Sequence, residues 1–303
     1  MKKVKGLKLE KGMKVSELVA GMGDVGFGAR NVSRASEILK KMKMDKDCKV
    51  FFGQAGAMVP AGMKYVLLDI LDFTDVFVCT GATLTHDLVE ALGFNHYFVD
   101  SNGRNFDDEA LNKKGVDRIY NVAMPNNVYE KMEDFFEENW DGLKECKTIK
   151  EFLWKLGEIC PGTAEDCILK KCYEKKIPLF CPALADSGIG LMIWGRKSAG
   201  KKIFIDAFED MKEIIDISWT AKKRGIIYVG GGVPKNFIQQ SLQFSKGAQY
   251  GIQITTDRAE PGGSSGAPLK EGISWGKMEN DAEFVDVNCD ATIALPLILA
   301  GAE

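Results

Sequence analysis

A lysine close to a tryptophan in the last tenth of the chain is the strongest candidate for chemistry. The sequence there reads Glu271-Gly272-Ile273-Ser274-Trp275-Gly276-Lys277. If residues 273–277 are extended, Trp275 and Lys277 project from the same face. An indole beside the ammonium would exclude water and lower the pKa of the lysine, which a lysine needs in order to form an imine. Spacing alone also fits an ordinary surface lysine, the commonest position of this residue type.

Two glycine-rich turns follow apolar segments, and both could approach a nucleotide. Gly230-Gly231-Gly232 follows residues 226–229, and Thr80-Gly81-Ala82 follows residues 76–79. Glycine lets the backbone come close to a ligand, and a helix that begins there offers free N–H groups. A tight strand-to-helix turn is the alternative, and the G-x-G-x-x-G fingerprint is absent. His86 begins the helix after the second turn, where it could contact a cofactor or cap that helix.

The segments that must position these residues alternate between short apolar strands and helices. Expected strands cover residues 49–52, 76–79, 177–181, 202–206 and 226–229, and expected helices include residues 63–71 and 87–92. This pattern predicts an α/β fold, a Rossmann-like doubly wound, mostly parallel sheet with helices on both faces. We expect an N-terminal helical arm over residues 1–45 and one catalytic domain over residues 46–303. Its acidic helical segment, at about residues 127–170, is typical of a solvated helix face.

Composition restricts the class of protein. The 303 residues are 45% hydrophobic and 27% charged, which is typical of a globular enzyme with a large core. A net charge of −3 argues against a nucleic-acid partner. No apolar stretch reaches about 18 residues and no signal peptide is evident, so we expect no membrane span and a cytoplasmic protein.

The eight cysteines of the chain are the remaining candidates for chemistry. A zinc site from Cys160, Cys167, Cys172 and Cys181 is conceivable, but their irregular spacing fits poorly. Reduced, buried thiols are the favoured interpretation, and we expect no metal.

Several segments together resemble the deoxyhypusine synthase family. Residues 265–277 resemble the signature around that family's catalytic lysine, and residues 181–188 resemble its P-A-x-x-D segment. Residues 230–235 resemble its glycine turn, and Asp290-Ala291 resembles its late cofactor-contacting pair. The likeness runs from about residue 20 to the end, with the segments in the family's order.

The resemblance implies an NAD-dependent aminobutyl transferase. Such enzymes oxidise spermidine, hold its butylamine group as an imine on a lysine, and pass it to a lysine of translation factor 5A. Related members use a small amine acceptor and form homospermidine. Lys277 would be the catalytic residue, and the implied substrate-binding residues are Glu271, Trp275, Asn236, Gly262 and Ser264. The implied cofactor-binding residues are Thr80, Gly81, Ala82, Asp186, Gly231, Gly232, Thr256, Ser265, Asp290 and Ala291.

The same resemblance implies a homotetramer with sites at dimer interfaces, but the polyamine end departs from the family pattern. Leu191 and Pro261 stand where the family has aspartates, Ser264 stands where some members have an acid, and Asn236 stands in place of a histidine. A buried polycation needs carboxylates or several acceptors to offset its lost hydration. We therefore expect the lysine chemistry to be retained and leave the amine donor and acceptor open. A non-catalytic regulatory homologue is a further alternative.

Overall fold

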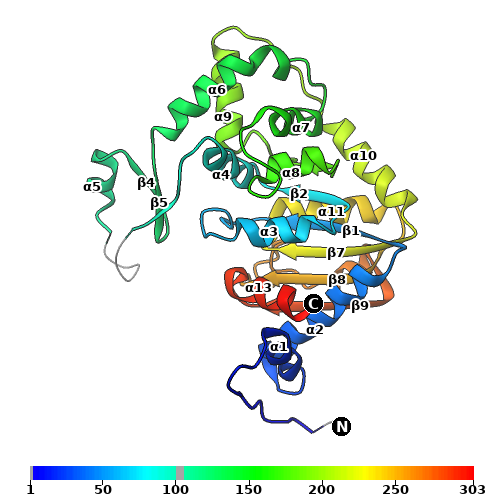
Figure 1. Ribbon diagram of the computed structural model, residues 1–303. Helices are drawn as coiled ribbons and strands as arrows, with labels where there is room; N and C mark the ends of the chain where they lie inside the picture. Colours follow the sequence, from blue (N-terminus) through cyan, green and yellow to red (C-terminus); the bar gives the residue numbers. More distant parts are fainter. Residues whose placement is uncertain (1–2, 100–105) are drawn as a thin grey trace. The chain divides into compact units, whose positions relative to one another are not determined.

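The computed structural model describes residues 3–99 and 106–303, and the chain forms two compact units (Figure 1). Unit 1 contains described residues from 1–55, 73–78 and 211–303. Unit 2 contains those from 56–72 and 79–210. Each unit is therefore assembled from segments that are distant in the sequence.

Unit 1 is built on parallel strands, which confirms the predicted class of sheet. Its strands follow the spatial order β2-β1-β7-β8-β9, and the pairs β1–β7, β7–β8 and β8–β9 are parallel. Side chains on neighbouring strands, such as those of Phe51 and Ile226, are fully buried, as expected for a sheet covered on both faces. The strand bounds are β1 (Cys48–Gln54), β2 (Val76–Cys79), β7 (Lys223–Val229), β8 (Ala248–Thr255) and β9 (Met278–Asn288).

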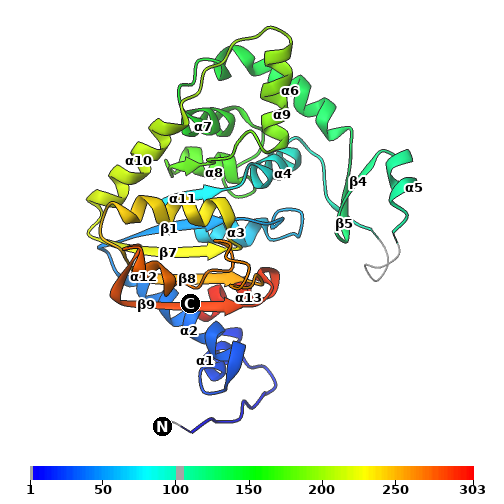
Figure 2. The ribbon, with the colours of Figure 1, turned by 180° about the vertical axis from the view of Figure 1, so that it is seen from behind.

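Helices cover both faces of this sheet. Figures 1 and 2 show α2 (Phe27–Met44) and α13 (Ala291–Gly301) on one face. On the other face lie α11 (Gly232–Gln243) and the one-turn helix α12 (Glu271–Ser274). These two helices and the turn that follows α12 carry the residues of greatest functional interest.

The predicted N-terminal arm corresponds to α1 (Val15–Met22) and α2, and both belong to unit 1. A methyl group at Gly301 of α13 would come within 2.6 Å of Val19 and Ser36, so the three helices pack tightly. The predicted boundary at residue 45 falls between α2 and β1, inside this unit.

Unit 2 is mainly helical and includes a small antiparallel sheet of order β3-β5-β4, which strand and helix alternation did not predict. The strands of this small sheet are β3 (Tyr97–Phe98), β4 (Val116–Ile119) and β5 (Val122–Pro125). Unit 2 also contains β6 (Leu179–Phe180), which is not part of it. Its helices are α3 (Lys64–Leu71), α4 (Gly81–Ala91), α5 (Asp108–Lys113), α6 (Val128–Leu143), α7 (Ile149–Ile159), α8 (Ile168–Glu174) and α9 (Gly188–Ser198). The remaining helix, α10 (Ala207–Thr220), has residues in both units.

A buried carboxylate joins α4 to α8 in unit 2. Asp87 accepts hydrogen bonds from the backbone N–H groups of Ile168 and Leu169, each at 2.9 Å. Its burial raises the pKa of the carboxyl to about 6, against the opposing effect of these donors. Because the donors are the first free N–H groups of α8, Asp87 stabilises the start of that helix.

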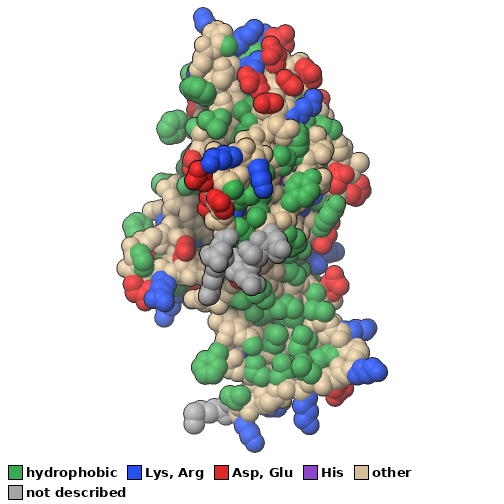
Figure 3. Space-filling model, turned by 90° about the vertical axis from the view of Figure 1, so that its left-hand side faces the viewer, with side chains coloured by type: hydrophobic (Ala, Val, Ile, Leu, Met, Phe, Trp, Pro, Cys, Tyr) green, Lys and Arg blue, Asp and Glu red, His purple; other side chains and the backbone are tan. Residues whose placement is uncertain are grey.

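The acidic segment forms α6, α7 and the beginning of α8. On α6, Phe136 and Trp140 are buried while the acidic side chains face outward, so the helix is amphipathic. Acidic side chains gather near the top of the face drawn in Figure 3. Arg196 of α9 forms ion pairs with Glu133 and Glu137.

The expected strand at residues 202–206 is wrong. That segment makes only an isolated bridge between Asp206 and Thr148, and Phe204 is 78% exposed. An apolar run becomes a strand only where a neighbouring edge takes up its backbone hydrogen bonds. Within the described ranges, every helix is too short or too polar to cross a membrane.

Candidate active site

Lys277 lies in a tight turn between α12 and β9. Residues 271–274 are helical, so the expectation that residues 273–277 are extended is wrong. Gly276 adopts a φ of 69°, in the left-handed region that glycine favours at the end of a helix. The Lys277 N–H then donates to the Gly272 carbonyl at 2.8 Å, and the Lys277 carbonyl accepts from Ala248 N–H at 3.0 Å. These bonds hold the backbone of the lysine at the edge of the sheet.

The turn nevertheless brings together the side chains that a strand was expected to align. The Lys277 Nζ lies 4.8 Å from the centre of the Trp275 ring. Partial burial lowers the pKa of Lys277, and the nearby Glu271 carboxylate opposes that effect. The amine is therefore easier to deprotonate than an exposed lysine, which increases its nucleophilicity near neutral pH.

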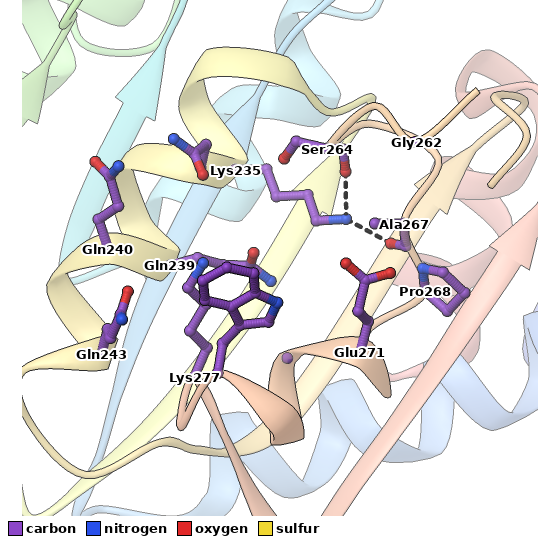
Figure 4. A pocket seen from close by; sticks show the side chains of 13 residues that line it. Lys235, Gln239, Gln240, Gln243, Gly262, Ser264, Ala267, Pro268, Glu271 and Lys277 are labelled. Atoms are coloured by element: carbon purple, nitrogen blue, oxygen red, sulfur yellow. Dashed lines mark hydrogen bonds between the residues drawn. The ribbon is translucent and has the colours of Figure 1, made fainter. Parts of the chain in front are cut away.

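A cavity of about 350 Å³ in unit 1 contains this lysine (Figure 4). All five residues expected to bind substrate line it together with Lys277: Asn236, Gly262, Ser264, Glu271 and Trp275. They come from α11, from the loop that follows β8, and from α12 with its following turn. The other lining residues are Lys235, Gln239, Gln240, Gln243, Ala267, Pro268 and Gly272.

Lys235 is a second lysine of this cavity, and we did not single it out as a site residue from the sequence. Its side chain is almost fully buried, and its Nζ donates to the Ser264 carbonyl at 2.7 Å and to the Ala267 carbonyl at 2.6 Å (Figure 4). Burial lowers its pKa to about 8, and the charge on Lys277 acts in the same direction. Asp286 and Glu271 oppose the shift. Through these two hydrogen bonds, Lys235 connects the loop of residues 264–267 to α11.

Three glutamines on α11 were also missed. Gln239, Gln240 and Gln243 line the cavity with Asn236, and Figure 4 shows the three glutamines along one helix. The spacing of these four positions is that of one helix face. An amide repeated at that spacing, directly after the glycine turn, is the signal that would have found them.

The glycine turn after β7 packs against the loop that carries Ser265. A Cβ on Gly231 would lie only 2.2 Å from the Ser265 Cα, so no larger residue fits without moving that loop. Gly232 begins α11, and space around it is open. The N-terminus of α11 therefore has free N–H groups that can bind an anion.

The other predicted cofactor residues of unit 1 lie after the ends of neighbouring strands. Thr256 follows β8, and Asp290 follows β9 and caps α13 by accepting from the Thr292 N–H at 2.7 Å. Ala291 is the first residue of α13. Because the strands are parallel, their carboxyl ends lie at one edge of the sheet, where ligands of such folds bind.

A second cavity, of about 380 Å³, lies beside these strand ends. Its lining residues include Gln253, Thr255 and Asp286. Gln253 is buried, and its Nε2 donates to the Ala267 carbonyl at 3.1 Å. Its Oε1 has no hydrogen-bond partner among the described residues. This cavity therefore offers a buried acceptor to a ligand that carries N–H or O–H groups.

Four predicted cofactor residues belong to unit 2. Thr80 caps α4 and accepts a long hydrogen bond from the Thr83 N–H at 3.4 Å. Gly81 and Ala82 begin that helix, and a Cβ on Gly81 would lie 2.5 Å from the Ser187 Cβ. The turn at residues 80–82 thus packs against the loop of Asp186 and Ser187. The structure brings the predicted residues together within each unit, and their convergence into one NAD site stays a prediction.

The two histidines form a chain of polar contacts in unit 2. His86 Nδ1 lies 3.0 Å from His96 Nε2, and His96 Nδ1 lies 2.8 Å from Glu90 Oε1. Glu90 also forms an ion pair with Lys64. Burial lowers the pKa of His86 to about 4, and His96 adds to the shift, so His86 is neutral at pH 7. Contact of His86 with a cofactor stays a prediction.

The four cysteines considered for zinc are free thiols buried in unit 2. Cys160 Sγ lies 3.5 Å from Cys167 Sγ, and Cys167 Sγ also contacts the Asp87 carboxylate. In the part of the chain that the structure describes, His, Cys, Asp and Glu form no group of three suited to a metal ion.

Comparison with known proteins identifies the family. A sequence model described as deoxyhypusine synthase matches residues 17–302. A protein of Methanosarcina acetivorans named "Probable deoxyhypusine synthase 1" is 42% identical over 301 residues, 98% of this chain and 93% of that protein. A protein of the same name from Archaeoglobus fulgidus is 40% identical, over 96% of this chain and 95% of its own.

The fold has a counterpart among crystal structures. A protein from Entamoeba histolytica, itself assigned as a deoxyhypusine synthase, aligns with a TM-score of 0.67 over 98% of this chain and 96% of its own, at 19% identity. That likeness concerns the fold, whereas the sequence matches extend over the cavity and the lysine it contains. The chain belongs to the deoxyhypusine synthase family, a family of transferase enzymes.

Proposed function

We propose that this protein is an NAD-dependent transferase that moves the butylamine group of spermidine, through an imine on Lys277, to a lysine of translation factor 5A. One observation carries the proposal: the amine of Lys277 lies over Trp275 in a polar cavity that lowers its pKa. Family membership supports the reaction class, and the five cavity residues expected from the family signature support the assignment of the site.

The chemistry of Lys277 is two exchanges of imine bonds. Its free amine attacks the oxidised carbon of the donor, a new C–N bond forms, and the bond to the leaving diaminopropane breaks, with a proton passing to that amine. The amine of the acceptor lysine then attacks the same carbon, and the bond to Lys277 breaks. Lys277 regains its proton and its starting form. Each exchange requires an unprotonated attacking amine, so the lowered pKa of Lys277 favours the first.

The residues at the strand ends fit a dinucleotide. The open N-terminus of α11 at Gly232 suits phosphate, and the unpartnered Oε1 of Gln253 suits a hydroxyl or carboxamide group. We propose that Gly231, Gly232, Thr256, Ser265, Asp290 and Ala291 hold NAD together with Thr80, Gly81, Ala82 and Asp186. Bound there, NAD would supply the hydride acceptor for oxidation of the donor and the hydride source for the final reduction.

The assembly, cellular location and domain division of the protein are proposals as well. We propose a cytoplasmic homotetramer whose sites are shared between chains, with residues 1–45 as an arm and residues 46–303 as the catalytic domain. Light scattering at micromolar concentration tests the assembly. A stable monomer would contradict it.

Trapping of the imine tests the proposed function. Borohydride added to the enzyme with NAD and spermidine should fix a mass increment on the peptide that contains Trp275 and Lys277. Lys277→Arg keeps the positive charge but has no free amine at neutral pH, so trapping and transfer should both disappear. NAD binding should survive in this variant. Full turnover by Lys277→Arg, with spermidine or any other amine, would exclude the covalent mechanism.

A further inference from the structure

The face of α11 that lines the cavity consists of carboxamides. Asn236, Gln239, Gln240 and Gln243 lie three or four residues apart, and all four line the cavity of Lys277. Gln239 is only 8% exposed. The side chains of these four residues make no hydrogen bond to any described residue. We call this set the amide face of α11.

A row of free carboxamides matches a particular kind of ligand. Each carboxamide has an acceptor oxygen and two N–H donors. A protonated polyamine has donors only, so it would leave the N–H groups of the amide face unpaired, at a cost for any that it buries. A peptide main chain alternates N–H and C=O groups and can pair with both halves of each carboxamide. The amide face is therefore complementary to an extended peptide.

Charge in the cavity favours the same ligand. Lys235 and Lys277 are its cationic side chains, and Glu271 is the one carboxylate among its lining residues, with Asp286 close to Lys235. A second polycationic arm would meet no further carboxylate there. A peptide main chain carries no charge, so the amide face can receive it without a compensating acid.

Exposed aromatic rings accompany the amide face. Trp275 lines the cavity and is 56% exposed, and Phe244, which directly follows Gln243, is 61% exposed. Large aromatic side chains at such positions are enriched in surfaces that bind other proteins. They offer apolar contacts to the side chains of a bound segment, while the carboxamides offer hydrogen bonds to its backbone.

We propose that the amide face of α11 docks the main chain of an extended polypeptide segment and so presents a lysine of that segment to the imine on Lys277. The proposal deepens the proposed function and rests on it for the transfer step. Docking itself requires neither NAD nor an amine donor, so binding can be measured separately from the reaction.

The test measures binding of fluorescently labelled translation factor 5A by anisotropy, with no NAD and no polyamine present. In Gln240→Leu/Gln243→Leu, the loss of two carboxamides should raise the Kd for the factor about tenfold. The matched control is Asn280→Leu, which removes an exposed carboxamide outside both cavities and should leave the Kd within about twofold. Gln243→Leu alone changes an exposed position and should raise the Kd about threefold. This single variant keeps the test valid if the double variant misfolds.

An unchanged Kd in both amide variants would overturn the docking proposal, even if spermidine is trapped on Lys277. Absence of factor binding to the wild-type protein at micromolar concentration would also overturn it and would favour a small amine acceptor. The proposed function fails by a different result, namely no trapping on Lys277 in the wild-type protein, which leaves the anisotropy comparison valid.

Discussion

Replacement of Lys235 by methionine should change how the stability of the protein depends on pH. The buried Nζ of Lys235 donates to the carbonyls of Ser264 and Ala267, and burial lowers its pKa from 10.5 to about 8. In the unfolded chain its pKa returns to about 10.4. Between these values the unfolded chain binds more protons than the folded protein, so the free energy of unfolding rises with pH.

The size of the effect follows from the shift. A lowering from 10.5 to about 8 corresponds to about 3 kcal/mol, gained as the pH rises from 7 to 10.5. Lys235→Met has no titrating group at this position and loses that gain. The difference in unfolding free energy between wild type and variant should therefore shift by about 3 kcal/mol in favour of wild type over this interval.

Urea unfolding of both proteins at pH 7, 8.5 and 10, followed by tryptophan fluorescence, measures this difference. At each pH, the free energy of unfolding of the variant is subtracted from that of the wild type. This difference cancels the titration of all groups that the two proteins share. If the two proteins show parallel dependence on pH, Lys235 keeps an ordinary pKa, and our account of its burial is wrong.

Three further predictions concern the cavity and the turn behind it. Glu271→Gln removes the carboxylate that raises the pKa of Lys277, so trapping of butanal on Lys277 by cyanoborohydride should proceed at lower pH than in wild type. Trp275→Leu exposes the amine to water and should shift the same profile to higher pH; identical profiles would contradict both predictions. Gly231→Ala forces a methyl group toward the Ser265 Cα and should destabilise the protein by about 1–3 kcal/mol in urea unfolding. Gly28→Ala, on a helix with open space around it, is the control and should stabilise by up to about 1 kcal/mol.

The parallel sheet could be predicted because its strands are short and apolar on both faces. Residues 76–79 and 226–229 have no polar side chain besides the Tyr228 hydroxyl, and each precedes a glycine turn, so pattern and position agreed. Residues 203–205 are equally apolar, but they lack a neighbouring strand edge. Whether a segment has a neighbouring strand edge is set by the tertiary fold, and the sequence of the segment itself does not indicate it.

The candidate site, like the sheet, was predicted only in part. Its five expected residues line one cavity because the family signature places them in segments that the fold brings together. The conformation of residues 273–277 was mistaken because local spacing could not distinguish a strand from a helix ended by Gly276. Lys235 was missed because its importance lies in burial and in two carbonyl contacts from a loop about thirty residues away.

Chemistry and recognition occupy different sides of this cavity, and so the departures from the family pattern can be reconciled with a retained reaction. Lys277, Trp275 and Glu271 lie in the one-turn helix α12 and the turn that follows it, whose geometry depends on Gly276 and on backbone bonds to Gly272 and Ala248. The amide face belongs to α11, and its side chains make no hydrogen bond to that turn. Substitutions such as asparagine at position 236 therefore alter which ligand groups are paired without altering the environment that lowers the pKa of Lys277. A change of partner through α11 would leave the imine chemistry unaffected, because the pKa of Lys277 is lowered by burial and raised by Glu271, and no side chain of the amide face is among these causes.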